Sequence, residues 1–155
     1  MSILTYDTCV FISYRPTKFP ASFLMSAVVI EELAAGAVDK SDLQKWEAVR
    51  KAHEKRGTLL VPTGEDWFVA GKVLNSLLRG LKARSDRRTP RLPASEKNRI
   101  IRDVLIARTV RRANAVLVTD NLKDFNLIRR FCAVKTRQAS SYFATSHSPS
   151  SSTKR

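Results

Sequence analysis

The sequence contains few cysteines, glycines and prolines, and each shortage excludes a class of protein. Cys9 and Cys132 lie far apart in apolar stretches of the 155-residue chain. Their spacing fits neither a zinc site nor a disulfide framework, so we expect both to be small core residues in a reducing compartment. Five glycines and six prolines are too few for a low-complexity or collagen-like chain. A mostly regular globular fold follows.

Long hydrophobic runs are also missing. No apolar run approaches the roughly 20 residues that a membrane span needs. The chain opens on Ser2 to Tyr6 without a basic segment followed by a longer apolar run and a cleavage site. We therefore expect a cytoplasmic protein with no membrane partner. Its length and its 43% apolar content fit one domain with a real core.

Acidic residues are scarce relative to basic ones. The chain has 28 lysines and arginines against 14 aspartates and glutamates, a formal net charge of +14. Such an excess indicates an anionic partner. Nucleic acid is the leading candidate because each neutralised phosphate adds to binding, while a membrane surface or an acidic protein would also satisfy the charge.

Strand and helix patterns alternate along the chain, which predicts an α/β domain with a mostly parallel central sheet flanked by helices. Strands are expected at 3–6, 58–61, 115–119 and 132–135, with a short extended piece at 23–26. Helices are expected at 8–14, 27–35, from a cap at Asp39 or Ser41 to Gly57, and at 65–78, 95–113 and 122–130. Residues 1–137 would form this domain. Residues 138–155, rich in Ser and Thr, would form a disordered tail.

Several acids lie in apolar surroundings. Asp7 and Asp120 each follow an expected strand, so both should lie at the carboxyl edge of the sheet, where ligands of such folds gather. Glu32 and Asp103 have apolar neighbours three and four residues away on their helices. By this criterion Glu31 is as plausible as Glu32. Any single acid could instead be a cap or half of an ion pair, but a group of buried carboxylates is costly unless a divalent cation neutralises it.

The arrangement of these motifs resembles the PIN-domain ribonucleases, and within them the VapC-like toxins of type II toxin–antitoxin pairs. The resemblance runs from residue 3 to about 135 and depends on four motifs in the family's order: Asp7-Thr8; Ser26 with Glu32-Leu33 and Gly36; Asp103-x-x-Ile106-Ala107; and Thr119-x-Asn121-x-x-Asp124-Phe125.

The resemblance implies a PIN-like fold and a Mg²⁺-dependent (or Mn²⁺-dependent) endoribonuclease. It implies that Asp7, Glu32 and Asp103 are catalytic metal ligands, which selects Glu32 over Glu31. Many relatives place the fourth acid at the position that Asn121 holds here, whereas others supply it from the Asp of the Asp-Phe pair, so we expect Asp124 to be the fourth ligand. Asp120 is an additional candidate ligand. It also implies RNA contacts near the metal from Thr8, Thr119 and Asn121, a cognate antitoxin and a homodimer.

One departure from the family is a long basic stretch at 79–94. Its arginines Arg84, Arg87, Arg88 and Arg91 could form an RNA-binding arm or a solvated loop. Both tryptophans, Trp46 and Trp67, fall on apolar helical stripes and are expected to fill the core rather than stack on bases. Two rival functions stay open: a non-catalytic module that binds RNA or an acidic partner, and a housekeeping PIN nuclease that processes RNA.

Overall fold

The fold is a parallel sheet covered by helices, and the computed structural model describes residues 2–14, 19–20, 22–84 and 92–145 of the chain. Strands β1 (Leu4–Tyr6), β4 (Val116–Thr119) and β5 (Thr136–Gln138) pair in parallel in the order β1-β4-β5. Strands β2 (Met25–Ser26) and β3 (Leu59–Leu60) form a second parallel pair. A parallel bridge between Thr5 and Leu24 joins the two sheets. The α/β class with a parallel sheet is therefore confirmed.

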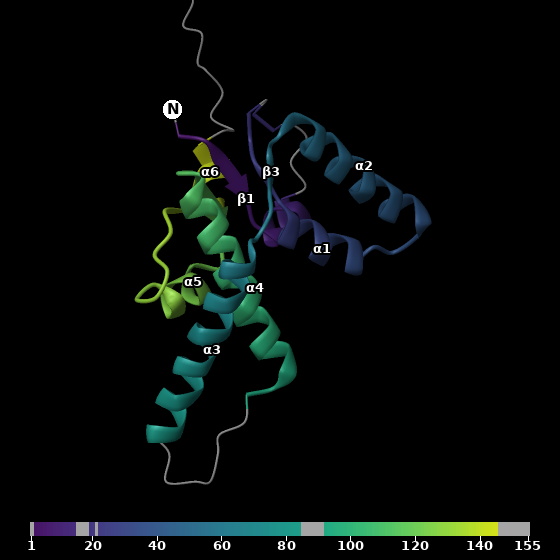
Figure 1. Ribbon diagram of the computed structural model, residues 1–155. Coiled ribbons are helices and arrows are strands. Elements are labelled where there is room, and N and C mark those ends of the chain that lie inside the picture. The colour runs from purple at the N-terminus through teal and green to yellow at the C-terminus, as the bar shows by residue number, and fades with distance from the viewer. Residues whose placement is uncertain (1, 15–18, 21, 85–91, 146–155) are drawn as a thin grey trace, which may run out of the picture.

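The helices pack around this sheet (Figure 1). A π-helical turn, η1 (Val10–Tyr14), and helices α1 (Ala27–Ala35) and α2 (Lys40–Arg56) follow the first strands. Helices α3 (Gly64–Arg84) and α4 (Ala94–Arg112) pack side by side as a long hairpin. Helix α5 (Leu122–Ile128) packs against α4, and helix α6 (Ala139–Thr145) lies beside β4 and β5.

Strand β4 is buried on both faces of the sheet, to which its successive residues point in turn. Leu117 packs into the larger core, with residues of α1, α3 and α4 such as Val29, Val73 and Val104. Val118, the next residue, packs into a smaller core with Tyr6. A strand buried on both faces needs a continuous apolar run, as Val116–Val118 supplies.

Helix boundaries mostly follow the expected capping residues. Asp39, rather than Ser41, caps α2 by accepting a 2.8 Å hydrogen bond from the Asp42 backbone N–H. Gly57 ends α2 with a φ of 68°, a left-handed conformation that glycine adopts without strain. Helix α1 begins and ends where the sequence predicted. Helix α4 instead begins at Ala94, with Pro93 rather than Ser95 at the capping position.

The C-terminal expectations were wrong in two places. The last strand, β5, lies at Thr136–Gln138 and not at 132–135. Residues 139–145, which the sequence analysis assigned to a disordered tail, form α6. The reason is aromatic packing: Ala139 is buried, and the Tyr142 ring lies 6.1 Å from that of Tyr6. Residues 146–155 lie outside the described part.

The basic stretch and one tryptophan also differ from expectation. Helix α3 continues six residues past the predicted end at Leu78, so Arg84 is an exposed residue of its last turn rather than part of a loop. Trp46 is buried as predicted, whereas Trp67 is 56% exposed. No helix within the described ranges is long and apolar enough to cross a membrane.

Candidate functional site

The sheet topology brings the two strand-end motifs together. Tyr6 of β1 pairs with Val118 of β4, so the two parallel strands end at the same edge. The Asp7 backbone N–H donates a 3.0 Å hydrogen bond to the Val118 carbonyl, which continues the ladder one residue further. Asp7 and Thr119 therefore emerge side by side, as the sequence analysis expected of this edge.

Asp7 is the most enclosed carboxylate at this edge, with 4% of its surface exposed. One oxygen, Oδ2, accepts hydrogen bonds from Thr119 Oγ1 at 2.6 Å and from Asn121 Nδ2 at 3.2 Å. The other, Oδ1, accepts from the Thr8 backbone N–H at 2.8 Å. These three donors hold the carboxylate in one orientation, so Thr119 and Asn121 act here as groups that position Asp7.

Glu32 reaches the same edge from α1, which follows β2 directly. The Thr8 hydroxyl donates a hydrogen bond to its Oε2, so Thr8 links the Asp7 and Glu32 side chains. Burial and the negative charge of Asp7 raise the pKa of Glu32. Its neighbour Glu31 points elsewhere: the Glu31 side chain is 55% exposed and pairs with Arg102 at 3.1 Å.

Asp103 on α4 completes the cluster. Burial, together with the negative charges of Asp7, Asp124 and Glu32, raises its pKa to about 8 despite partial compensation from Arg99. Three acids from other parts of the chain thus lie close enough to Asp103 to raise the pKa of its carboxyl group. The cluster brings together Asp7, Glu32, Asp103 and Asp124, the four acids that the sequence analysis took as catalytic metal ligands.

Asp120 has different partners. Its Oδ2 accepts a hydrogen bond from the Tyr14 hydroxyl, and its Oδ1 accepts one of 3.0 Å from the Ser140 backbone N–H. Against the effect of burial, these hydrogen bonds lower the pKa of Asp120. The side chain is exposed and ties β4 to η1 and α6. It is absent from the charges that raise the pKa of Asp103.

Two arginines that the sequence analysis did not single out border the cluster. Arg99 Nη1 lies 3.5 Å from Asp124 Oδ2, and Arg102 Nη1 lies 3.9 Å from Glu32 Oε1. They are three residues apart on α4, so they lie on neighbouring positions of one helix face, four residues and one residue before Asp103. Two arginines at these positions before a candidate acid were the signal available in the sequence.

The donor chemistry of the cluster fits a hard divalent cation. Carboxylate oxygens are the ligands that Mg²⁺ and Mn²⁺ prefer, and a cation would remove the mutual repulsion that raises the pKa of Asp103 and Glu32. Within the described ranges, no three His, Cys, Asp or Glu side chains are already arranged to hold an ion. Ligation would therefore require the carboxylates to move toward one another.

The expected arm does not join this site within the described part of the chain. Arg84 ends α3, whereas the acids of the cluster lie on α1, α4, α5 and the end of β1. Arg87, Arg88 and Arg91 lie outside the described residues. The two histidines do not contribute either: His53 is buried and its Nδ1 pairs with Thr58 Oγ1 at 2.8 Å, and His147 lies outside the described part.

The roles of Asp124 and Asp120 can be separated experimentally. Asp124→Asn should lower any metal-dependent cleavage by about 10-fold or more, because it removes charge from the cluster. Asp120→Asn should leave cleavage within a few-fold of the wild type while weakening the contacts to Tyr14 and Ser140. Measuring cleavage and melting temperature for both variants tests this. Loss of cleavage in Asp120→Asn alone would make Asp120 the fourth ligand.

Comparison with known proteins adds a finding on the fold. No family model matches the sequence, and no curated protein matches it either. Solved structures do match, among them VapBC-1 from nontypeable Haemophilus influenzae and DNA-bound VapBC from Salmonella typhimurium. The first is 21% identical over 89% of this chain and 98% of that chain, with a TM-score of 0.53. The second is 21% identical over 90% and 99%, with the same TM-score of 0.53. This chain therefore has the α/β fold of a VapBC chain, which confirms the predicted PIN-like, VapC-like architecture.

Proposed function

We propose that this protein is a Mg²⁺-dependent (or Mn²⁺-dependent) endoribonuclease and the toxin of a toxin–antitoxin pair. The observation that carries the proposal is the meeting of Asp7, Glu32, Asp103 and Asp124 at one edge of the sheet, where the negative charges of the other three raise the pKa of Asp103. Four carboxylates kept together at such a cost call for a cation. The excess of basic residues supports RNA as the substrate.

The side chains divide the work. Asp7, Glu32, Asp103 and Asp124 would hold the cation. When bound, Mg²⁺ polarises a phosphate oxygen and activates a water for attack on phosphorus. Thr119 and Asn121 orient Asp7, and Thr8 orients Glu32. Arg99 and Arg102, which lie beside Asp124 and Glu32, would contact the phosphates of RNA.

The proposal is tested with purified protein and a single-stranded RNA. Cleavage should require Mg²⁺ or Mn²⁺ and should stop in EDTA. Mn²⁺ should also raise the melting temperature, since an ion that binds only the folded state stabilises it. Undiminished cleavage in EDTA would reject the metal mechanism. Tight RNA binding without cleavage under any metal would favour the non-catalytic binding module.

A protein partner is part of the proposal. Both solved structures are of VapBC, so an antitoxin is the partner we expect here. The resemblance to VapC-like toxins also implies a homodimer. Coexpression with the product of a neighbouring small gene should yield a complex that no longer cleaves RNA. Cleavage that no such partner inhibits would instead favour a housekeeping nuclease.

The basic stretch carries a separate prediction. Replacing Arg84, Arg87, Arg88 and Arg91 by Ala should weaken RNA binding and flatten its salt dependence, because each lost phosphate contact lowers the log–log salt slope by roughly 0.7 for a single strand. The measurement is RNA affinity at several salt concentrations. The same slope in wild type and variant would leave the stretch as a solvated surface.

A further inference from the structure

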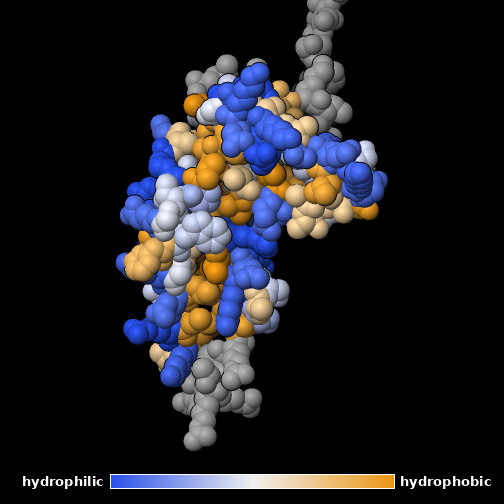
Figure 2. All heavy atoms as spheres, turned by 45° about the vertical axis from the view of Figure 1, so that its right-hand side comes forward, coloured by the Kyte–Doolittle hydropathy of each residue, from blue (hydrophilic) through white to orange (hydrophobic). Residues whose placement is uncertain are grey.

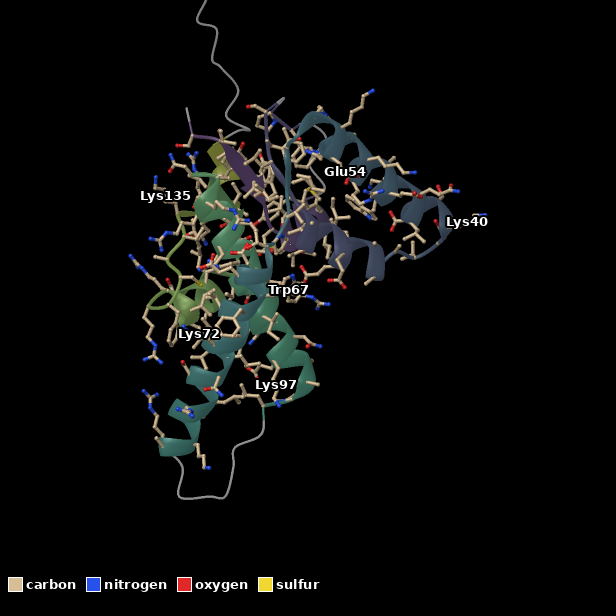
Figure 3. The ribbon with its side chains drawn as sticks, in the orientation of Figure 1. Lys40, Glu54, Trp67, Lys72, Lys97 and Lys135 are labelled. Carbon is tan, nitrogen blue, oxygen red and sulfur yellow. The ribbon has the colours of Figure 1, made fainter. Side chains whose placement is uncertain are left out.

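The feature that the proposed function leaves unexplained is the exposed indole of Trp67. A large aromatic ring that is 56% exposed is unusual, because the free energy of burying it is not gained. Trp67 lies on the first turns of α3, as Figure 3 shows by its label. Two neighbouring side chains decide its direction. Asp66 and Ala70, on the adjacent face, are fully buried against α4, so Trp67 is turned outward.

The indole borders a hollow between α1, α3 and α4 with a volume of about 400 Å³. Its walls are mostly apolar, with Val28 from α1 and Ile101 and Leu105 from α4. Figure 2, in which the right-hand side of Figure 1 is turned forward, shows hydrophobic side chains reaching the surface of the molecule among hydrophilic ones. An apolar hollow of this size beside an exposed aromatic ring accommodates a flat group.

The polar end of this hollow is linked to the carboxylate cluster through Arg102. Glu31 and Arg102 both line it, and the two side chains pair through two contacts of 3.1 Å. The third nitrogen of the same guanidinium, Arg102 Nη1, lies 3.9 Å from Glu32 Oε1. Arg102 therefore lies between a group bound in the hollow and Glu32, a proposed metal ligand. Asn98, one helical turn before Arg102, adds an amide to the rim.

We propose that this hollow is a subsite for one unpaired base of the RNA, stacked on Trp67 and bordered by Asn98, Glu31 and Arg102. The inference rests on the proposed function, because the base is placed beside the phosphate that the carboxylate cluster would act on. Aromatic rings are stacking platforms for unpaired bases, and amide, carboxylate and guanidinium groups donate to or accept from base edges. The net charge of +14 favours an anionic strand over an apolar peptide as the occupant.

The platform is fixed in place by the fold. Thr63 and Asp66 cap the start of α3 through reciprocal hydrogen bonds of 2.8 and 3.3 Å, and Arg108 and Arg112 hold Asp66 from α4. Trp67 follows Asp66 directly. The ring is thus carried on a locked helical turn, which reduces the ordering cost of stacking.

The test uses Asp103→Asn protein, which should cut RNA at least about 100-fold more slowly than the wild type, in EDTA and with a labelled single-stranded RNA. Trp67→Ala in this background should weaken binding by roughly 10-fold or more, since one base stack is lost, and should leave the log–log salt slope unchanged. Trp67→Phe should retain most of the affinity. The matched control is Phe68→Ala: Phe68 is 70% exposed on the next position of α3 but does not line the hollow.

A second measurement does not depend on a Trp67 variant. Replacing single bases of the RNA by abasic nucleotides, one position at a time, should identify one position whose base is needed for affinity. That loss should disappear in Trp67→Ala. RNA should also quench the fluorescence of Trp67 more strongly than that of Trp46, which is buried.

The outcomes separate the subsite from the proposed function. Equal affinities for Trp67→Ala and Phe68→Ala, or no abasic effect, would overturn the subsite even if the wild type cleaves RNA. A smaller log–log salt slope in Trp67→Ala would indicate that a phosphate contact, not base stacking, was lost, and would also overturn the subsite. A change of oligomeric state in Trp67→Ala would assign the face to a second copy of the chain. Trp67-dependent binding in a wild type that never cleaves would support the subsite and refute the nuclease.

Discussion

Asp103→Asn should lower metal-dependent RNA cleavage by about 100-fold or more while leaving the protein folded and, at neutral pH, more stable. The loss is expected because a neutral amide removes one negative charge from the group that would hold the cation, and even outer-shell partners of metal ligands typically contribute about 10- to 100-fold. The gain in stability is expected because Asp103 is the group at which burial and the neighbouring acids act together.

The pH dependence of this effect has a definite sign. Burial and neighbouring charges raise the pKa of Asp103 from 3.8 to about 8, so between these values the folded protein binds a proton there that the unfolded chain has lost. The free energy of unfolding should then fall as the pH rises from about 4 to about 8. Asp103→Asn should flatten this decline. Mg²⁺ should reduce it too, because the ion offsets the charge.

Measurement of cleavage rate and urea unfolding at pH 5, 7 and 8.5 checks both parts of this prediction. Asp7→Asn and Glu32→Gln should lose cleavage to a similar extent, although Asp7→Asn also disturbs the three hydrogen bonds that hold Asp7. Asp42→Asn, a change on α2 away from the cluster, is the control and should leave cleavage near the wild-type rate. Full activity in Asp103→Asn would show that Asp103, and with it α4, supplies no ligand to the metal.

The sequence predicted the strand ends of the site well, for a physical reason. A buried parallel strand requires an apolar run, and a carboxylate directly after such a run must lie at the carboxyl edge, which places Asp7 without further information. Glu32 was harder. Glu31 and Glu32 have equally apolar helical neighbours, and only the contacts of Thr8 and Arg102 in the folded chain direct one inward and the other outward.

Other features depended on contacts distant in sequence and could not be read locally. Trp67 lies on an apolar helical stripe, yet its ring is exposed because Asp66, beside it, is held inward by arginines more than 40 residues away. Residues 138–155 as a whole are rich in Ser and Thr, and the helix at 139–145 depends on packing against Tyr6 near the start of the chain. The composition of a segment shows how much apolar surface it has, but not which distant segment packs against that surface.

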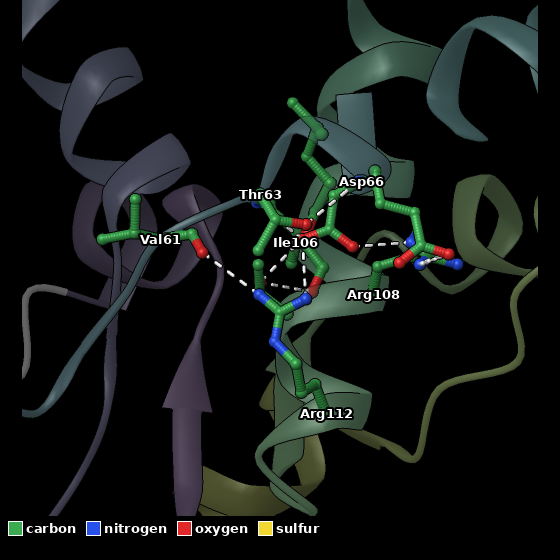
Figure 4. A network of polar contacts seen from close by, with 9 residues as sticks. Val61, Thr63, Asp66, Ile106, Arg108 and Arg112 are labelled. Carbon is green, nitrogen blue, oxygen red and sulfur yellow. Dashed lines mark hydrogen bonds and ion pairs between the residues drawn. The ribbon is translucent and has the colours of Figure 1, made fainter. Parts of the chain in front are cut away.

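Asp66 itself is the basis of the second large prediction. Its side chain is fully buried and accepts 2.7 Å hydrogen bonds from Arg108 Nε and Arg112 Nη1, together with one of 2.8 Å from the Thr63 backbone N–H (Figure 4). Arg112 also donates to the Val61 carbonyl at 3.1 Å. These bonds join the end of β3, the start of α3 and the last turns of α4. Against the effect of burial, they hold the pKa of Asp66 well below its usual range.

Asp66→Ala should therefore lower the free energy of unfolding by about 3 kcal/mol, the lower end of the cost of removing one partner from a buried ion pair. The lower end applies because Arg108 and Arg112 are 26% and 48% exposed and water can solvate part of their charge. Glu65→Ala is the matched control: Glu65 is the preceding residue, is 78% exposed and lies 3.9 Å from Arg108, so its removal should cost less than about 0.5 kcal/mol. The effect of acid distinguishes an ion pair from simple packing.

The contribution of Asp66 to the free energy of unfolding is complete above its unfolded pKa of 3.8 and is lost as the pH falls toward its folded pKa. The difference in stability between wild type and Asp66→Ala should therefore shrink below about pH 4. Urea unfolding of wild type, Asp66→Ala and Glu65→Ala at pH 7 and pH 3 measures both effects.

If Asp66→Ala is no less stable than Glu65→Ala at pH 7, helices α3 and α4 are held together by their apolar contacts alone. The buried carboxylate would then contribute nothing to the position of Trp67.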